Sequence, residues 1–198
     1  MLKRGIDIFF SLLILILLLP VFLIIGVLIL WDDGFPVFYR QKRIGRNFKP
    51  FDLIKFRTMY KDADKKGLLT VGSKDSRVTR VGYYLRKYKL DELPQFINVL
   101  KGDMSIVGPR PEVPKYVALY NERQKRVLSV RPGITDEASL KYIDESDVLA
   151  KSDNPERDYI EKIMPEKLEI NLNYIENSSI LYDIKIIIKT ALRMFFRQ

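Results

Sequence analysis

The segment IFFSLLILILLLPVFLIIGVLILW runs from Ile8 to Trp31 and holds no charged residue over 24 positions. A run of about 20 apolar residues is long enough to cross a bilayer as a helix, whereas a helix in a soluble core is rarely apolar on every side. A cleavable signal peptide fits poorly, because the run is too long and no Ala-x-Ala-like site follows it. The sequence therefore predicts a membrane element over residues 1–33.

Pro20 divides this apolar run into two halves. An interior proline removes a backbone hydrogen bond and usually kinks a helix. Each half holds about a dozen residues and so covers roughly 18 Å, at about 1.5 Å per residue, of a hydrocarbon core about 30 Å thick. Two topologies compete: a kinked helix that spans the membrane, and a re-entrant helix that returns to the side from which it entered.

The charges that flank the apolar run favour the re-entrant topology. Lys3 and Arg4 precede it, and basic residues follow it at positions 40, 42, 43, 46 and 49. Because positive residues prefer the cytoplasmic side, both ends favour the same side of the membrane. We predict a re-entrant anchor over residues 1–33, broken at Pro20, and a cytoplasmic domain over residues 34–198.

The carboxyl-terminal stretch predicts an amphipathic helix. In SSILYDIKIIIKTALRMFFRQ a basic residue recurs at every fourth position, as Lys185, Lys189, Arg193 and Arg197, and apolar residues fill much of the remaining circumference. Such a helix can lie in the interface of an anionic leaflet. It can equally pack on the domain with a solvated basic face, and both arrangements can hold on different faces.

Composition narrows the chemistry. The 198 residues carry a formal net charge of +9, which predicts attraction to nucleic acid, phosphorylated ligands or an acidic membrane. The chain has no Cys and no His, which excludes disulfides, thiolate nucleophiles, Ser-His-Asp catalysis and His- or Cys-ligated metals. An enzyme of this composition relies on carboxylates, Lys, Arg, Tyr, hydroxyl groups and oxygen-bound cations such as Mg²⁺.

The rest of the chain predicts a helix-rich α+β fold. Residues 37–59 mix β-branched and aromatic side chains around a Gly45-Arg46-Asn47 break, which predicts a small β-hairpin or a pair of short strands. Residues 61–74 are polar and contain glycine, which predicts a loop, and residues 135–154 form a polar, acidic stretch. Helices are predicted over residues 81–89, 94–100 (closed by Gly102), 113–130, and 159–175 with a break at Pro165.

The most concentrated polar block is YYLRKYKLDELPQFINVLKGDMSIVGPRPE, from Tyr83 to Glu112. Asp91 and Glu92 stand directly before Leu93-Pro94, and Pro94 suits the first turn of a following helix. We therefore expect both carboxylates at a helix amino terminus, whose partial positive charge keeps them ionised. The alternative is ordinary capping by an acidic residue.

Cations surround this carboxylate pair in the sequence. Arg86 lies upstream, Arg110 sits between two prolines, and Lys55 and Arg57 lie in the stretch Lys55-Phe56-Arg57-Thr58-Met59. The planar guanidinium of Arg suits phosphate, and two carboxylates amid such cations make sense if Mg²⁺ and a diphosphate share the site. A carboxylate can then attack phosphorus. For each single Arg or Lys the alternative is a solvated surface charge.

Taken together, these motifs resemble the small monotopic phosphoglycosyl transferases, bacterial enzymes that load polyprenyl phosphate with a phosphosugar. The matching stretches, in order, are KFRTM (55–59), LDELPQ (90–95), NVLKGDMS (98–105), GPRP (108–111) and VRPGIT (130–135). A charged, then apolar, then proline-broken amino terminus fits as well, because this family is anchored by a re-entrant helix. The resemblance runs from about residue 3 to residue 135, and more loosely beyond.

The resemblance implies a reaction. The family takes a UDP-sugar, forms a covalent phosphosugar on the Asp of its Asp-Glu pair, releases UMP and passes the phosphosugar to undecaprenyl (polyprenyl) phosphate. Asp91 would then be the nucleophile, and Glu92, with Asp91, would hold Mg²⁺. Arg110 matches the phosphate-binding Arg of the family, and Lys55, Arg86 and Arg131 match basic residues of its substrate-binding region.

The resemblance also implies a place and partners. The catalytic domain, residues 34–198, would work at the cytoplasmic face of the bacterial inner membrane, with its carboxyl-terminal helix at the interface. The expected partners are the UDP-sugar donor, polyprenyl phosphate and membrane phospholipid, and not nucleic acid; a homodimer is left open. The product would start a cell-surface glycan or glycoconjugate.

Two departures from the family pattern leave open the geometry of the re-entrant helical hairpin and the identity of the sugar. The family often has Ser-Pro at the helix break, where this chain has Leu19-Pro20, and a Leu side chain cannot bond the carbonyl that the proline frees. Many members continue Gly-Leu-Ala-Gln-Val where this chain has Asp136-Glu137-Ala138-Ser139-Leu140. The competing functions are a non-catalytic, membrane-anchored basic module and a hydrolase that releases phosphosugar to water.

Overall fold

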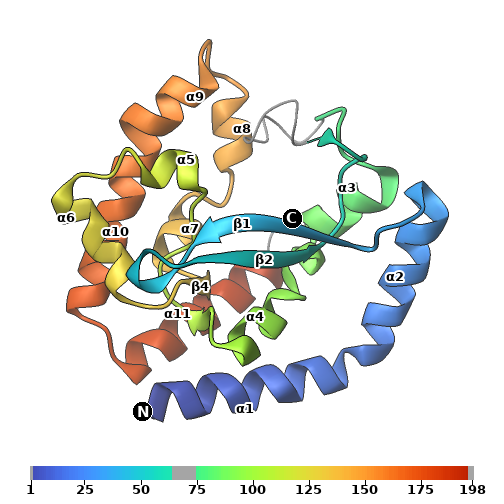
Figure 1. The fold of residues 1–198 in the computed structure, drawn as a ribbon, viewed down its shortest axis with the longest axis horizontal. Helices are drawn as coiled ribbons and strands as arrows, with labels where there is room; N and C mark the ends of the chain where they lie inside the picture. Colours follow the sequence, from blue (N-terminus) through green and yellow to red (C-terminus); the bar gives the residue numbers. More distant parts are fainter. Residues whose placement is uncertain (1, 64–74, 196–198) are drawn as a thin grey trace.

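The computed structural model describes residues 2–63 and 75–195. Most of the loop predicted over residues 61–74 therefore lies outside the described residues, as does Arg197. The described chain has a helix-rich α+β architecture, in which helices surround a long β-hairpin (Figure 1). The predicted fold class is confirmed in this respect.

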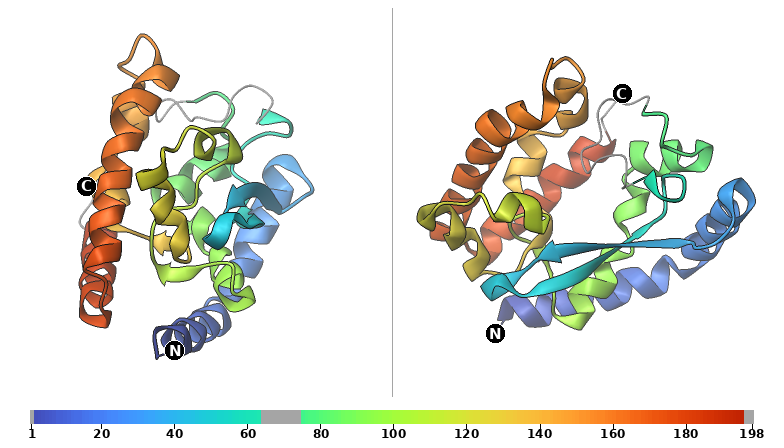
Figure 2. Two further views of the ribbon diagram at one scale, coloured as in Figure 1. Left: turned by 60° about the vertical axis from the view of Figure 1, so that its left-hand side comes forward. Right: turned by 45° about the horizontal axis from the view of Figure 1, so that its top comes forward.

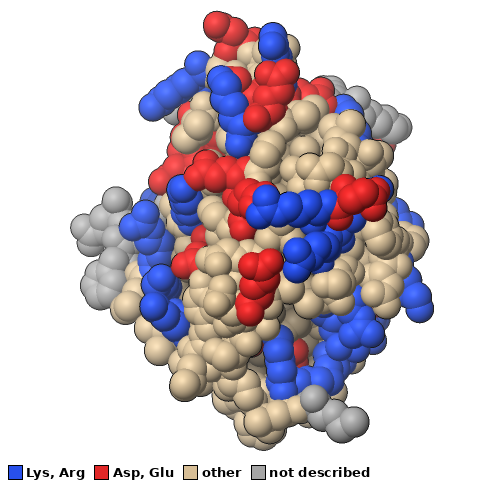
Figure 3. Space-filling view, turned by 90° about the vertical axis from the view of Figure 1, so that its left-hand side faces the viewer, with Lys and Arg blue, Asp and Glu red and all other residues tan. Residues whose placement is uncertain are grey.

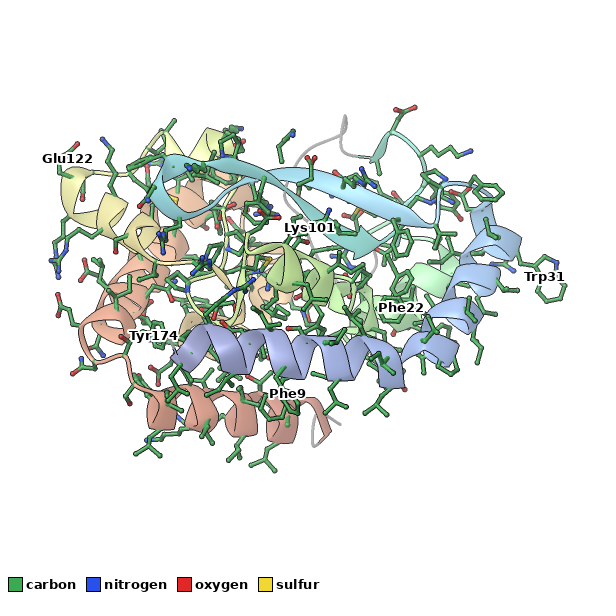
Figure 4. The ribbon with its side chains drawn as sticks, turned by 60° about the horizontal axis from the view of Figure 1, so that its bottom comes forward. Phe9, Phe22, Trp31, Lys101, Glu122 and Tyr174 are labelled. Carbon is green, nitrogen blue, oxygen red and sulfur yellow. The ribbon has the colours of Figure 1, made fainter. Side chains whose placement is uncertain are left out.

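The amino-terminal apolar run forms two helices, α1 (Leu2–Leu17) and α2 (Leu19–Asp33), whose axes are bent by 60°. Pro20 lies in the first turn of α2, so the predicted break is confirmed. Within the described residues no single helix has the length and apolarity needed to cross a membrane, whereas α1 and α2 together do. Much of their apolar surface is exposed, and Trp31, 89% exposed, projects away from the protein at the end of α2 (Figure 4).

Polar contacts tie the start of α1 to the remainder of the domain. The Lys3 ammonium contacts the Asp183 carboxylate at 2.5 Å and donates to the carbonyl of Val107. Arg4 donates to two carbonyls in the last turn of α4 (Gln95–Lys101). The buried Asp7 carboxylate accepts from the Ser105 hydroxyl at 2.8 Å and from a backbone N–H at 3.1 Å. The first two turns of α1 are therefore part of the folded domain.

A second set of contacts ties down the end of α2. The Arg57 guanidinium donates to the carbonyls of Asp33 and Gly34 and forms an ion pair with the Asp33 carboxylate at 3.0 Å. Asp32 accepts from the backbone N–H of Val81 at the start of α3 (Arg80–Lys87). Because Arg57 is 6% exposed, this tether lies inside the protein.

The predicted hairpin is confirmed as β1 (Phe38–Ile44) and β2 (Pro50–Phe56), paired antiparallel from Phe38 opposite Phe56 to Ile44 opposite Pro50. A short 3₁₀ turn, η1 (Arg46–Phe48), joins the strands, at the Gly45-Arg46-Asn47 break. The apolar residues of β2 face inward, and Phe56 packs with Ile25, Ile29 and Leu85 from α2 and α3.

A second, parallel pair joins β3 (Ser105–Val107) to β4 (Gly133–Thr135). The strands meet next to a pair of glycines. A Cβ on Gly133 would lie 2.1 Å from the backbone nitrogen of Gly108, so no side chain fits there. This close approach holds the turn after β3, which contains Arg110, against the chain that enters β4.

Two further predicted helices are confirmed as α3 and α4, and α4 is closed by Gly102 with φ = 92°, a left-handed conformation that favours glycine. The other helical elements are short except for the last two. They are η3 (Leu90–Glu92), α5 (Pro114–Val117), α6 (Glu122–Lys125), η4 (Arg126–Ser129), α7 (Glu137–Lys141), α8 (Glu145–Leu149), α9 (Pro155–Asp158), η5 (Tyr159–Ile163), α10 (Met164–Glu176) and α11 (Ile180–Phe195).

The single helix predicted over residues 113–130 is wrong, because the chain forms α5, α6 and η4 there. Asn121 starts a new helix with a capping box: its side chain accepts from the Gln124 N–H, and the Gln124 side chain accepts from the Asn121 N–H. The break predicted at Pro165 is also wrong. The π-helix η5 leads directly into α10. Pro165 lies in the first turn of α10, where no N–H is needed.

The predicted carboxyl-terminal amphipathic helix is confirmed as α11. Its Ile186 is fully buried and its Asp183 is held by Lys3 and Tyr174, so one face packs on the domain. Leu181 and Ile188 remain exposed on other faces. Packing on the domain and an exposed apolar surface therefore coexist on this helix.

The main apolar core lies between α5, η4, α8 and α10, and the hairpin runs between this side of the molecule and the α2–α3 side (Figure 2). The outer face over α6 and α10 carries interleaved acidic and basic side chains (Figure 3). Exposed ion pairs such as Arg123–Glu169 are typical of such a face and contribute little stability.

Candidate active site

Asp91 and Glu92 lie in the 3₁₀ turn η3, one turn before α4. The preceding residue, Lys89, adopts a left-handed conformation with φ = 57°, and this reverses the chain between α3 and the carboxylates. The predicted position just before a helix is confirmed. Asp91 is 8% exposed, so its carboxyl group is held inside the protein.

Glu92 is the centre of a charge cluster. Its Oε1 lies 2.6 Å from Nη2 of Arg110 and 3.2 Å from Nζ of Lys55, and its Oε2 lies 3.3 Å from Nη1 of Arg110. Burial alone would raise the pKa of Glu92, but the charges of Arg110 and Lys55 outweigh it and hold that pKa well below its usual range. Burial lowers the pKa of Lys55, with Glu92 opposing, while Glu92 raises the pKa of Arg110.

Asp91 has the opposite environment. Its Oδ1 is buried and accepts no hydrogen bond from any residue that the structure describes. Burial raises the pKa of Asp91, and the nearby charge of Lys55 offsets this in part. The sequence predicts that a helix terminus keeps both carboxylates ionised. At Asp91, burial opposes ionisation. At Glu92, the charges that stabilise the ionised form come from the side chains of Arg110 and Lys55. The pair consists of one carboxylate held by cations and one with a free oxygen.

A cavity of about 960 Å³ opens beside this pair. Six of the predicted residues line it, from four different segments of the chain: Lys55, Arg57, Arg86, Asp91, Glu92 and Arg110. The structure does not bring Arg131 to this cavity. Its Nε donates to the carbonyl of Gly102 at 2.8 Å, beside the end of α4.

A polar network that the sequence did not predict lines the cavity. Arg43 donates to the carbonyl of Pro111 at 2.9 Å and to Glu112 at 3.0 Å, and the Tyr159 hydroxyl donates to the other oxygen of Glu112. Burial raises the pKa of Tyr159, and so do the charge and hydrogen bond of Glu112. The network fixes the residues that follow Arg110. Its sequence signal was weak: Glu112 borders the Gly-Pro-Arg-Pro motif, but nothing marked its partners.

The segment in which the chain departs from the family pattern also lines the cavity, through Ser139 and Leu140, and Glu145 lines it a few residues further on. Asp136, 2% exposed, caps α7 by accepting from the Ser139 N–H at 2.9 Å. The variant residues therefore lie next to the cavity that holds the carboxylates.

The donor set fits one mode of Mg²⁺ binding. Within the described residues no group of three or more Asp or Glu side chains gathers into a metal cage. Mg²⁺ is, however, usually held by one or two carboxylates, with water and substrate phosphates completing its shell. Asp91, with a buried unpaired oxygen, and the adjacent Glu92 fit that mode.

The bent helix pair has the length and apolarity of a membrane element. Together with a cavity that holds two carboxylates among Lys and Arg side chains, it defines a class of protein: a domain with an apolar helix pair and a site that suits a phosphorylated ligand. The chain belongs to the bacterial sugar transferase family, whose model matches residues 1–197.

Curated relatives act on undecaprenyl phosphate. The chain is 38% identical over 203 residues to a UDP-glucose:undecaprenyl-phosphate glucose-1-phosphate transferase of Escherichia coli, an alignment that covers 98% of this chain and 40% of the relative. It is 36% identical over 191 residues to a UDP-N-acetylgalactosamine-undecaprenyl-phosphate N-acetylgalactosaminephosphotransferase of Aeromonas hydrophila, covering 95% of this chain and 42% of the relative. The chain thus spans less than half the length of these two relatives.

A third relative is of similar size. The chain is 34% identical over 203 residues to the exopolysaccharide production protein ExoY of Sinorhizobium fredii, covering 95% of this chain and 83% of that protein. The names of the first two relatives carry different sugars, so family membership leaves the sugar of this chain undetermined.

Proposed function

We propose that this protein transfers a sugar phosphate from a UDP-sugar to undecaprenyl phosphate, releases UMP and so starts the assembly of a cell-surface glycan. The observation that carries the proposal is the contrast within the carboxylate pair. Asp91 has a buried oxygen without a hydrogen-bond partner, while Arg110 and Lys55 hold the neighbouring Glu92. A free carboxylate oxygen beside cations is what a nucleophile needs for attack on a phosphate.

The first step forms a bond between a carboxylate oxygen of Asp91 and the β-phosphorus of the UDP-sugar. The bond from that phosphorus to the bridging oxygen breaks, and UMP leaves with the bridging oxygen and its electron pair. Arg110 and Lys55 lie beside Glu92 and Arg86 lines the same cavity, so these side chains would neutralise charge on the transferred and leaving groups.

The second step regenerates the enzyme. A phosphate oxygen of undecaprenyl phosphate attacks the same phosphorus, and the bond to Asp91 breaks, which restores the carboxylate. The product is undecaprenyl diphosphate sugar. Neither step requires His or Cys, and the chain contains neither. Asp91 and Glu92 would hold Mg²⁺, which when bound supplies positive charge to the diphosphate.

The tethers at the two ends of the bent helix pair support the proposed topology. Lys3, Arg4 and Asp7 bind one end to the folded domain, and Arg57 binds the other. A folded domain cannot lie on both sides of a bilayer, so two tethered ends support a re-entrant anchor rather than a spanning helix. The domain, its cavity and the basic flanks would then lie together at the cytoplasmic face.

The test is UMP release by purified protein with Mg²⁺ and undecaprenyl phosphate across a panel of UDP-sugars. We expect release with one or a few sugars, dependent on the lipid phosphate and lost in Asp91→Asn. Release that proceeds equally without lipid phosphate would indicate a hydrolase. If the folded protein released no UMP from any donor, the proposal would be wrong for these donors.

A further inference from the structure

Among the residues that the structure describes, two buried oxygens in the wall of the cavity accept no hydrogen bond. One is Oδ1 of Asp91, and the other is Oδ1 of Asn171. A buried amide oxygen without a donor costs free energy of folding, so such a group in a binding cavity needs an explanation. The proposed reaction explains the unpaired oxygen of Asp91, because the Asp91 carboxylate is its nucleophile. The unpaired oxygen of Asn171 has no role in that reaction.

Asn171 is positioned by the cavity face of α10. Met164, Lys167 and Leu168 lie seven, four and three residues before it, on the same side of the helix, and line the cavity with it. Asn171 is 4% exposed, and its neighbour Leu172 packs into the main core. The helix is therefore fixed by its apolar contacts, and the amide has little freedom to turn toward solvent.

The place of Asn171 relative to Arg110 indicates which part of the substrate it meets. Both residues also line a small recess of about 20 Å³ that borders the cavity, together with Pro111 and Glu112. If Arg110 neutralises the transferred phosphate, Asn171 lies near one of the two groups bonded to that phosphate, the sugar and the α-phosphate. An ionised α-phosphate only accepts hydrogen bonds, whereas sugar hydroxyl groups also donate them, so an unpaired acceptor such as Oδ1 matches the sugar. The uracil and the ribose lie beyond the α-phosphate.

The surrounding wall has the donors and acceptors that a sugar requires. The Lys167 ammonium pairs with Glu145 at 2.7 Å and lies 5.7 Å from the centre of the Tyr159 ring. Lys167, Glu145 and Tyr159 all line the cavity. Sugar hydroxyl groups both donate and accept hydrogen bonds, and so match a wall in which charged side chains of both signs stand beside aromatic rings.

We propose that Asn171 is a specificity-determining residue of the donor site, whose Oδ1 accepts a hydrogen bond from a hydroxyl or acetamido N–H group of the sugar. The proposal rests on the proposed function and adds to it the part of the cavity that reads the sugar. A donor that lacks the hydrogen at that position leaves Oδ1 buried and unpaired, and such sites discriminate strongly against these analogues.

The experiment uses the full chain, the best UDP-sugar of the panel and its deoxy or deacetylated analogues. Asn171→Leu replaces the amide with an apolar group of similar size, Asn171→Ala removes it without adding bulk, and Asn173→Leu is the matched control on the exposed side of α10. Donor and UMP affinities are measured by calorimetry alongside kcat/KM for each donor. Thermal unfolding shows which variants are folded.

We expect one analogue to lose about 10-fold or more in kcat/KM with the natural protein, and that loss to disappear in Asn171→Leu or Asn171→Ala. Donor affinity should fall with the same substitutions, while UMP affinity changes by less than about 2-fold and Asn173→Leu has no effect. Equal losses for UMP and donor would assign Asn171 to the nucleotide and overturn the proposal. So would unchanged donor preference in a folded variant, as expected if Asn171 only holds a water molecule. Natural protein without UMP release or donor binding would instead overturn the proposed function.

Discussion

Arg110 faces Glu92 with both arms of its guanidinium, one at 2.6 Å from Oε1 and the other at 3.3 Å from Oε2. The pair joins the turn after β3 to the turn before α4, and Lys55 from β2 contacts the same carboxylate. The two elements that would bind phosphate and supply the nucleophile are therefore fixed relative to one another before any substrate arrives.

This geometry predicts that Arg110→Lys is not a conservative change. Lysine keeps the charge but offers one point contact in place of two directed N–H groups, so Glu92 loses half of its bidentate partner. We expect kcat/KM for UMP release to fall by about 10- to 100-fold, with the fold retained. Arg123→Lys, in the exposed ion pair with Glu169, is the matched control and should have natural activity. Equal activity in the two variants would contradict the role of Arg110.

The free oxygen of Asp91 predicts a separation of activity from stability. Asp91→Asn removes the nucleophile but places a neutral group where burial disfavours a charge. We expect UMP release to fall by about three orders of magnitude or more, while the melting temperature and membrane association are unchanged or improved. Glu92→Gln serves as the comparison, because it should lower activity and weaken the response to Mg²⁺. Activity of Asp91→Asn near that of the natural protein would exclude it as the nucleophile.

The raised pKa of Asp91 predicts a pH dependence. Only the ionised carboxylate attacks, so kcat/KM should fall as pH decreases through the pKa of Asp91, and at a higher pH than for a solvated carboxyl group with a pKa near 4. The folded state also binds this proton more tightly than the unfolded chain. The stability contribution of Asp91 is therefore present below the unfolded pKa and is lost as pH rises through the folded one. Melting temperatures in metal-free buffer across pH 4–8 should diverge from those of Asp91→Asn toward alkaline pH. Parallel curves would contradict the raised pKa.

The close approach of α3 to the segment after β2 predicts a steric requirement. A Cβ on Gly82 would lie 2.1 Å from the carbonyl oxygen of Thr58, so Gly82→Ala must displace backbone and should destabilise the protein by about 2 kcal/mol or more. Gly5→Ala in α1 meets nothing within 4 Å and should be neutral or slightly stabilising, because alanine favours helix. Thermal unfolding distinguishes the two. Similar melting temperatures would show that the Thr58 segment can move.

The tethered helix pair predicts the accessibility of its ends. The chain has no cysteine, so Leu2→Cys and Phe35→Cys each introduce one unique thiol at an exposed position. With a re-entrant anchor, a membrane-impermeant reagent should label both from the cytoplasmic side only. Labelling from opposite sides would establish a spanning helix.

The sequence was sufficient where local chemistry decides the structure. A proline in an apolar run, β-branched and aromatic residues around a Gly-Arg-Asn break, and the glycine after α4 each act over a few residues, and these elements were predicted correctly. The helix over residues 113–130 was not, because its apolar spacing is real and its inward residues are buried, yet the Asn121 capping box restarts the chain in the middle. Periodicity reports which side chains are buried and does not require a continuous helix.

The candidate site also contains residues that the sequence could predict and residues that it could not. Motif residues such as Lys55 and Arg110 could be named because chemistry marks them, and the structure brings them together at Glu92. Asn171 and the partners of Glu112 could not, because their significance lies in which atoms meet across the fold. An asparagine in a helix carries no sequence signal that its amide oxygen will be buried without a donor.

If the α1–α2 pair is the re-entrant anchor that we propose, its two tethers have a consequence for how the protein responds to its membrane. An ordinary anchor adjusts to bilayer thickness by tilting. A re-entrant helix pair that is fixed at both ends to one folded domain cannot tilt without breaking the contacts of Asp7 or Arg57. The depth of insertion is then set by the protein and not by the thickness of the bilayer. A cavity held at a set height above the acyl chains would meet the phosphate of its carrier at the same level in thin and thick membranes alike.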